Sequence, residues 1–70
     1  MQDIDRAVGE RIRKIRKRKG ITQDQLAELA GLNRTHLYRL ESGKQSMTLR
    51  TLKVIAVALE VRVGQIVKGL

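Results

Sequence analysis

The side chains of this sequence that could do chemistry are hydrogen-bonding groups gathered between Asn33 and Gln45. Arg34 and Arg39 each present a planar fork of N–H donors, which fits paired acceptors such as those on a guanine edge or a phosphate. Thr35 adds a hydroxyl and a methyl group to the same stretch. These groups favour recognition by direct contact over covalent chemistry.

The sequence offers little for catalysis or metal binding. It contains one histidine and no cysteine, so disulfides and thiolate zinc sites are excluded. The nearest carboxylate pair, Asp24 and Glu28, has ordinary helix-surface spacing and no obvious partner base or metal ligand. We therefore expect a protein that is not an enzyme, with no metal site, no cofactor and no small-molecule substrate.

The charge of the chain favours a polyanionic partner. Fifteen Lys and Arg stand against seven Asp and Glu, which gives a net charge of +8, and nucleic acid is the commonest partner of such a chain. Proteins that bind single strands or RNA usually stack bases on several aromatic side chains, and here Tyr38 is the only aromatic residue. The composition therefore predicts double-stranded DNA as the partner.

A membrane role is not favoured by the sequence. The longest apolar run, Val54 to Leu59, is too short to span a bilayer, and the acidic N-terminus lacks the order of a signal peptide. A basic run between Arg11 and Lys19 leaves open a nonspecific polyanion or membrane-surface binder. Acidic residues in the same part of the chain argue against that alternative, so we expect a cytoplasmic protein with no membrane partner.

A framework of five short helices and no strand is predicted by the hydrophobic spacing, as one domain spanning residues 1–70. The first helix would run from about Asp3 to Lys19, and Gly9 inside it would cost about 1 kcal/mol relative to alanine. The last helix would span Val63 to Lys68. The apolar positions expected to be buried are Ile4, Val8, Ile12 and Ile15 in the first helix and Leu49, Leu52, Ile55, Ala56 and Leu59 in the fourth, which Thr48 would cap. Glycines at 20, 31, 43, 64 and 69 are expected where helices end.

The two middle helices have clear start and stop signals. Thr22 and Gln25 form a capping box for a helix over Gln23–Ala30, which Gly31 would end. Asn33 can cap the next helix, and Gly43 would close it. At about 100° per residue, Leu37 and Leu40 face inward in that helix, while Thr35, Tyr38, Arg39 and Ser42 face outward.

Residues 22–43, TQDQLAELAGLNRTHLYRLESG, resemble the helix-turn-helix domains of the phage lambda-repressor and Cro family. The motifs that carry the resemblance are Thr22-Gln23, Leu26-Ala27, Ala30-Gly31, Leu37 with Leu40, and Glu41-x-Gly43. The stretch Asn33-Arg34-Thr35-His36-Leu37 followed by Glu41 is similar to the controller proteins of restriction-modification systems. Those proteins have an acidic residue where this chain has Asn33 and often Tyr where it has His36. The resemblance covers essentially the whole chain and implies a compact all-α bundle that binds DNA.

The helix between the Asn33 cap and Gly43 would then be the recognition helix, with Arg34 in the first turn, which enters deepest into the major groove. We expect Arg34, Thr35 and Arg39 to read bases. Gln23, through its resemblance to a family residue, would bond a phosphate. The side chains expected at the DNA backbone are Gln23, Asn33, Tyr38, Ser42, Lys44 and Gln45, and Arg11 and Arg13 are further candidates.

Simpler roles stay open for several of these residues. Arg34 and Arg39 could be solvated surface charges, Thr35 could be a second capping residue, and Gln23 could belong only to the helix cap. Tyr38 could pack over the edge of its helix instead of touching a phosphate.

An ion pair between Arg16 and Glu41 is predicted by the helical wheel. Each residue borders the apolar side of its helix, so the two would lie together between the first and third helices, an arrangement that the family also shows. The alternative is two unrelated surface charges.

Apolar residues near the C-terminal end exceed what one small core requires. We expect part of this surplus to form a homodimer interface, with Val54, Val57, Val61, Val63, Ile66 and Val67 as its residues. Two recognition helices about 34 Å apart would read a palindromic operator. The sequence thus predicts a sequence-specific transcriptional regulator, and the alternative is a DNA-binding antitoxin or protein-interaction module of the same fold.

Overall fold

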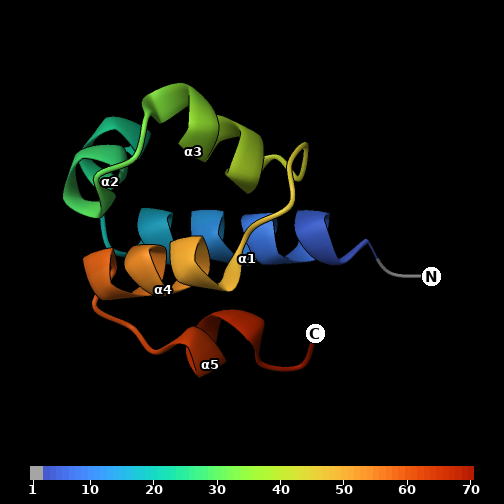
Figure 1. The fold of residues 1–70 in the computed structure, drawn as a ribbon. Coiled ribbons are helices and arrows are strands. Elements are labelled where there is room, and N and C mark those ends of the chain that lie inside the picture. The colour runs from blue at the N-terminus through green and yellow to red at the C-terminus, as the bar shows by residue number, and fades with distance from the viewer. Residues whose placement is uncertain (1–2) are drawn as a thin grey trace.

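The computed structural model describes residues 3–70, and it contains five α-helices wrapped around one apolar core (Figure 1). The helices are α1 (Ile4–Arg18), α2 (Gln23–Ala30), α3 (Arg34–Glu41), α4 (Leu49–Ala58) and α5 (Val63–Val67). No strand occurs within the described residues. The all-α prediction is therefore confirmed, and α2 has the predicted bounds.

Side chains cap the starts of the first four helices, as their sequences require. The Asp3 carboxylate accepts a hydrogen bond from the Arg6 amide at 3.2 Å, and the Thr48 hydroxyl accepts one from the Thr51 amide at 3.0 Å. At α2 the capping box is complete, because Thr22 and Gln25 each accept a hydrogen bond from the other's amide. These bonds satisfy amides that have no partner inside the helix and fix where each helix begins.

The turn between α2 and α3 sets the angle between the two helices. Gly31 has φ 67°, a left-handed conformation that glycine adopts without strain. The Leu32 amide then donates to the Ala27 carbonyl at 2.8 Å, and the Leu32 side chain packs against the core. The Asn33 side chain accepts from the Thr35 amide at 2.8 Å and starts α3. A tight turn with few free torsions therefore joins the two helices.

The core is formed by aliphatic residues from all five helices. In Figure 1, α2 and α3 lie above α1, whereas α4 and α5 lie in front and below. α1 packs against α3 and α5, α2 packs against α3 and α4, and α4 packs against α5. The largest fully buried side chains are Ile12, Leu26, Leu37, Leu40, Ile55, Leu59 and Ile66. No helix within residues 3–70 is long and apolar enough to cross a membrane.

Gly9 lies where α1 crosses α3. A Cβ atom at this position would overlap the carbonyl oxygen of Leu40 and lie 2.8 Å from that of Glu41. Only glycine lets the two backbones come this close. The helix-propensity cost of about 1 kcal/mol for glycine at this position is therefore smaller than the benefit of the close contact between α1 and α3.

Three details of the predicted framework are wrong. Ile4 and Leu49 were expected in the core but are 53% and 84% exposed. Both lie in the first turn of their helix. Gly64 was expected at a helix end and instead lies inside α5.

Candidate nucleic-acid interface

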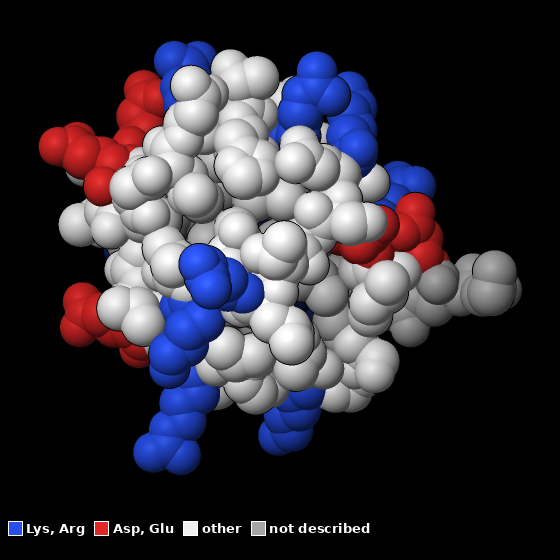
Figure 2. Space-filling model, in the orientation of Figure 1, with Lys and Arg blue, Asp and Glu red and all other residues white. Residues whose placement is uncertain are grey.

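α3 divides into a buried side and a solvent-facing side. Leu37 and Leu40 are fully or almost fully buried, whereas the polar residues expected on the outer side are all exposed. These exposed residues are Arg34, Thr35, Tyr38, Arg39 and Ser42. Basic side chains project from the top edge of the molecule in Figure 2, where α3 lies in Figure 1. The outer side of α3 therefore presents cationic and hydrogen-bonding groups to solvent.

The first turn of α3 brings its arginine against α2. The Nε atom of Arg34 lies 3.2 Å from the Oδ1 atom of Asp24, and both side chains are about two thirds or more exposed. Thr35 keeps an unburied side chain, since only its backbone amide serves the cap on Asn33. Arg39 is exposed and forms no ion pair with any described residue. All three base-reading candidates thus lie on one exposed helix side.

The end of α3 places further candidates near one another. The ammonium of Lys44 lies 5.5 Å from the centre of the Tyr38 ring, a cation–π contact, and Gln45 is exposed beside it. The Ser42 hydroxyl donates to the Tyr38 carbonyl at 2.8 Å. Ser42 therefore already uses its proton within the helix, and only its lone pairs remain for other partners.

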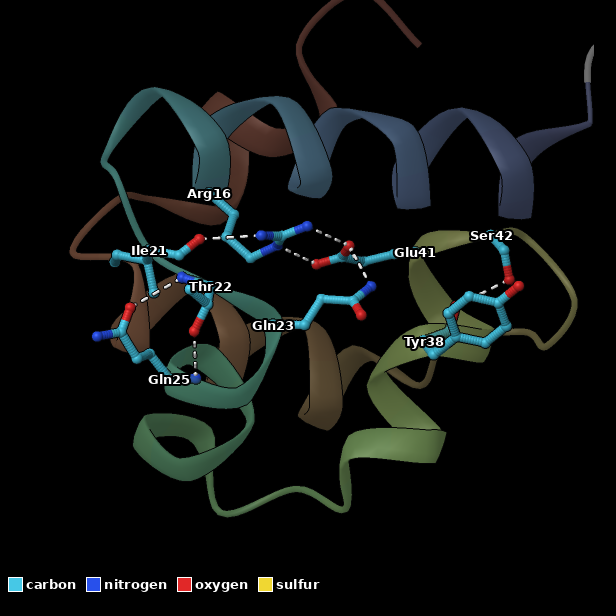
Figure 3. A network of polar contacts seen from close by, with 8 residues as sticks. All are labelled: Arg16, Ile21, Thr22, Gln23, Gln25, Tyr38, Glu41 and Ser42. Atoms are coloured by element: carbon cyan, nitrogen blue, oxygen red, sulfur yellow. Dashed lines mark hydrogen bonds and ion pairs between the residues drawn. The ribbon is translucent and has the colours of Figure 1, made fainter.

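Arg16 and Glu41 form the predicted ion pair, and it is buried between α1 and α3 (Figure 3). Arg16 Nε donates to Glu41 Oε2 at 2.7 Å and Arg16 Nη2 donates to Glu41 Oε1 at 3.0 Å. A third donor, Nη1, bonds the Ile21 carbonyl at 2.9 Å. The two side chains are 7% and 5% exposed, so this bidentate pair links the end of α1, the segment leading into α2, and α3.

Gln23 joins the same network from the first position of α2. Its Nε2 atom donates to Glu41 Oε1 at 3.0 Å (Figure 3). The sequence predicted a phosphate contact for Gln23 and did not predict this bond. Gln23 lines an open groove of about 750 Å³, together with residues that include Arg13, Lys17 and Tyr38.

Arg11 faces the other end of the molecule. Its Nη1 atom donates to the carbonyls of Ile66 at 3.3 Å and Lys68 at 3.0 Å, at the C-terminal end of α5. These bonds hold the Arg11 guanidinium against the end of α5, whereas the sequence suggested a contact with the DNA backbone. A cation at the exposed carbonyls of a helix end serves the fold instead.

The predicted dimer residues do not form a single exposed surface. Ile66 is completely buried within one protomer, because α5 packs against both α1 and α4. Its assignment to a dimer interface is wrong. The partly buried Val61, Val63 and Val67 also pack against the core, so only Val54 and Val57 of the predicted set are exposed, at 36% and 62%.

Comparison with known proteins adds family relationships to this geometry. The sequence pattern of a family described as helix-turn-helix matches residues 12–66. The immunity repressor protein of Bacillus phage phi105 is 45% identical over 60 residues, and the control protein C.SmaI of Serratia marcescens is 36% identical over 64 residues. The matches cover 86% and 91% of this chain, respectively. They span 42% of the phage repressor and 76% of the control protein, so the chain corresponds to less than half of the former's length.

A solved structure shows the same fold. The restriction-modification controller protein C.Esp1396I, crystallised as a tetramer in complex with its natural 35 base-pair operator, superposes with a TM-score of 0.82 and 30% identity. The superposition covers 97% of this chain and all of that one.

Proposed function

The chain belongs to the helix-turn-helix family, and on this premise we propose that it is a sequence-specific regulator of transcription that binds double-stranded DNA. One observation carries the proposal: a rigidly held α3 whose outer side consists of exposed arginines and hydrogen-bonding side chains. Two relatives are named a repressor and a control protein, and a third protein of this fold was solved on its operator.

The roles of the exposed side chains follow from the order in which α3 would meet a major groove. Arg34, in the first turn, is the candidate for a bidentate contact with a guanine, while Thr35 and Arg39 extend the contact along the groove. Asn33, Tyr38, Lys44 and Gln45 flank this strip and are proposed to contact phosphates. Ser42 would have to give up its bond to the Tyr38 carbonyl before its hydroxyl could donate to a phosphate.

Gln23 would reach a phosphate from the start of α2, where free backbone amides also face an anion. Its bond to Glu41 supports this role, since it fixes the amide group in a groove that Arg13 and Lys17 also line. The buried ion pair would thereby orient one DNA contact as well as join helices.

We propose that the protein acts as a homodimer on a palindromic site. Val54 and Val57 on α4, together with Leu70, leave apolar surface exposed. A two-fold interface there would bury it and set the spacing of two recognition helices. Because the proposed partner is a DNA operator, we also propose the cytoplasm as the working compartment.

Selection of bound sequences from a random pool of duplexes tests the function directly. A palindromic consensus is expected, and recovery of no consensus would contradict sequence-specific binding. Sedimentation of the free protein at micromolar concentration tests the dimer, and a strict monomer that binds DNA as one copy would contradict it.

Two substitutions separate base reading from backbone contact on the selected duplex. Arg34→Ala should weaken binding to the operator far more than binding to random DNA, because a base contact carries the preference. Lys44→Ala should weaken both equally and reduce the salt dependence, since each phosphate contact releases counterions. Equal losses on both DNAs from Arg34→Ala would contradict its proposed role.

A further inference from the structure

An acidic side chain stands directly beside the proposed guanine-reading arginine. Asp24 lies in the first turn of α2, and its Oδ1 atom is 3.2 Å from Nε of Arg34 in α3. Red side chains in Figure 2 cluster at the left, where α2 lies, next to the basic edge formed over α3. A carboxylate at this place is unexpected, because it would repel the phosphates of the proposed partner.

The geometry of the pair leaves the reading end of the arginine free. A guanidinium carries one N–H on Nε and two on each terminal nitrogen. The closest approach of Asp24 is to Nε, and within residues 3–70 neither terminal nitrogen of Arg34 forms a hydrogen bond. These two terminal nitrogens can together meet the O6 and N7 acceptors of a guanine.

We propose that Asp24 is a positioning residue, which holds the guanidinium of Arg34 so that its two terminal nitrogens face a guanine edge. The inference rests on the proposed function. Arginine has a long side chain with many rotamers, and fixing it before binding lowers the entropy lost in the complex. The tight turn at Gly31 makes the contact possible, because it brings Asp24 and Arg34 together although they are ten positions apart in the sequence.

A purely structural role for Asp24 makes different predictions. An acidic residue in the first turn of a helix stabilises that helix through its dipole. In that case its removal would lower stability and leave base preference unchanged. The two roles are therefore distinguished by measuring discrimination at one base pair as well as unfolding.

Glu28 provides a matched control. It lies one turn after Asp24 on the same helix, is exposed, and forms no ion pair with a described residue. Asp24→Asn and Glu28→Gln each remove one negative charge and change little else. Both should strengthen binding to random DNA by similar factors, because both raise the net charge equally.

The experiment measures the dissociation constant by fluorescence anisotropy for the selected operator and for duplexes with each guanine replaced in turn. Arg34→Ala first identifies the base pair that Arg34 reads, where the wild type should discriminate by about 5- to 150-fold. At that pair Asp24→Asn should reduce discrimination by at least about threefold, whereas Glu28→Gln should leave it unchanged. Asp24→Glu, which keeps the charge, should restore part of the loss. In the Arg34→Ala background, Asp24→Asn should have no further effect on discrimination.

Three results would overturn the inference, and each has a separate meaning. Unchanged discrimination in Asp24→Asn, with Arg34→Ala still losing it, refutes positioning by Asp24 alone. An increase in discrimination in Asp24→Asn would show that the carboxylate holds Arg34 away from DNA. If Arg34→Ala discriminates at every base pair as strongly as the wild type does, Arg34 reads no base, and Asp24 has no reader to position.

Discussion

Replacing Glu41 by glutamine tests how strongly the buried ion pair holds α3. The carboxylate accepts two hydrogen bonds from Arg16, at 2.7 and 3.0 Å, and one from Gln23 at 3.0 Å. A glutamine has one acceptor oxygen and one NH2 group, so an N–H of Arg16 would face another donor. Arg16 is only 7% exposed, and its guanidinium would keep the Ile21 carbonyl as its other protein acceptor.

The expected loss is large relative to the stability of so small a protein. Breaking a buried pair by removing one partner destabilises by about 3–5 kcal/mol. We expect about 3 kcal/mol, because the glutamine oxygen can retain one bond. Seventy residues at about 0.05–0.15 kcal/mol each give a total of about 4–10 kcal/mol. Such a loss would lower the melting temperature by about 12–24 °C.

Urea unfolding followed by far-UV circular dichroism, at one fixed protein concentration, measures the effect. Glu41→Gln, Arg16→Met and the double variant form a cycle, and the coupling energy between the two positions should be about 2 kcal/mol or more. The exposed Glu10–Lys14 pair, 3.9 Å apart, is the control, and Glu10→Gln should change stability by less than about 0.5 kcal/mol. A coupling energy near zero at Arg16 and Glu41 would refute the reasoning.

Four further substitutions test individual contacts and backbone conformations of the fold. Gly9→Ala should destabilise the protein by about 2 kcal/mol, because its methyl group meets the α3 backbone. Gly64→Ala should stabilise it by about 0.5–1 kcal/mol, because a Cβ there meets no neighbouring segment within 4 Å and alanine favours the helix. Equal urea midpoints for the two variants would contradict this contrast. Glu60 has φ 58°, the only positive value at a described residue other than glycine, so Glu60→Gly should raise stability by about 1 kcal/mol, and a lower urea midpoint would count against strain there. Arg11→Met should lower stability by about 1 kcal/mol and leave the salt dependence of DNA binding unchanged, because this arginine bonds the end of α5; a shallower salt dependence would show a phosphate contact instead.

Local chemistry made the middle of the fold predictable from sequence. The Thr22–Gln25 capping box and Gly31 fix both ends of α2 through bonds within a few residues, so the predicted bounds match the structure. The Arg16–Glu41 pair was also predictable, since the helical wheel places both residues at the border of an apolar side. A buried charge without a partner is strongly destabilising, so two opposite charges at such positions are expected to pair.

Contacts between distant segments explain what the sequence pattern missed. Periodicity indicates which side of a helix is apolar, but Leu49 and Ile4 show that it does not indicate which turns of that side are buried. Ile66 was assigned to a dimer because the pattern does not reveal that α5 folds back onto α1 and α4. The contact of Asp24 with Arg34 was missed for the same reason, and the fixed length of the turn between α2 and α3 was the signal that could have found it.

The division of α3 into two sides has a consequence for engineering new binding preferences. Arg34, Thr35 and Arg39 project from the outer side, and none of their side chains is buried or bonded to the core. A combinatorial library randomised at these three positions should therefore consist mostly of folded members, provided that Asn33 still caps the helix and Leu37 and Leu40 are kept. With the base-reading roles proposed above, members of such a library would prefer different operators while keeping the same fold, so the protein would be a suitable small scaffold for directed evolution of DNA specificity.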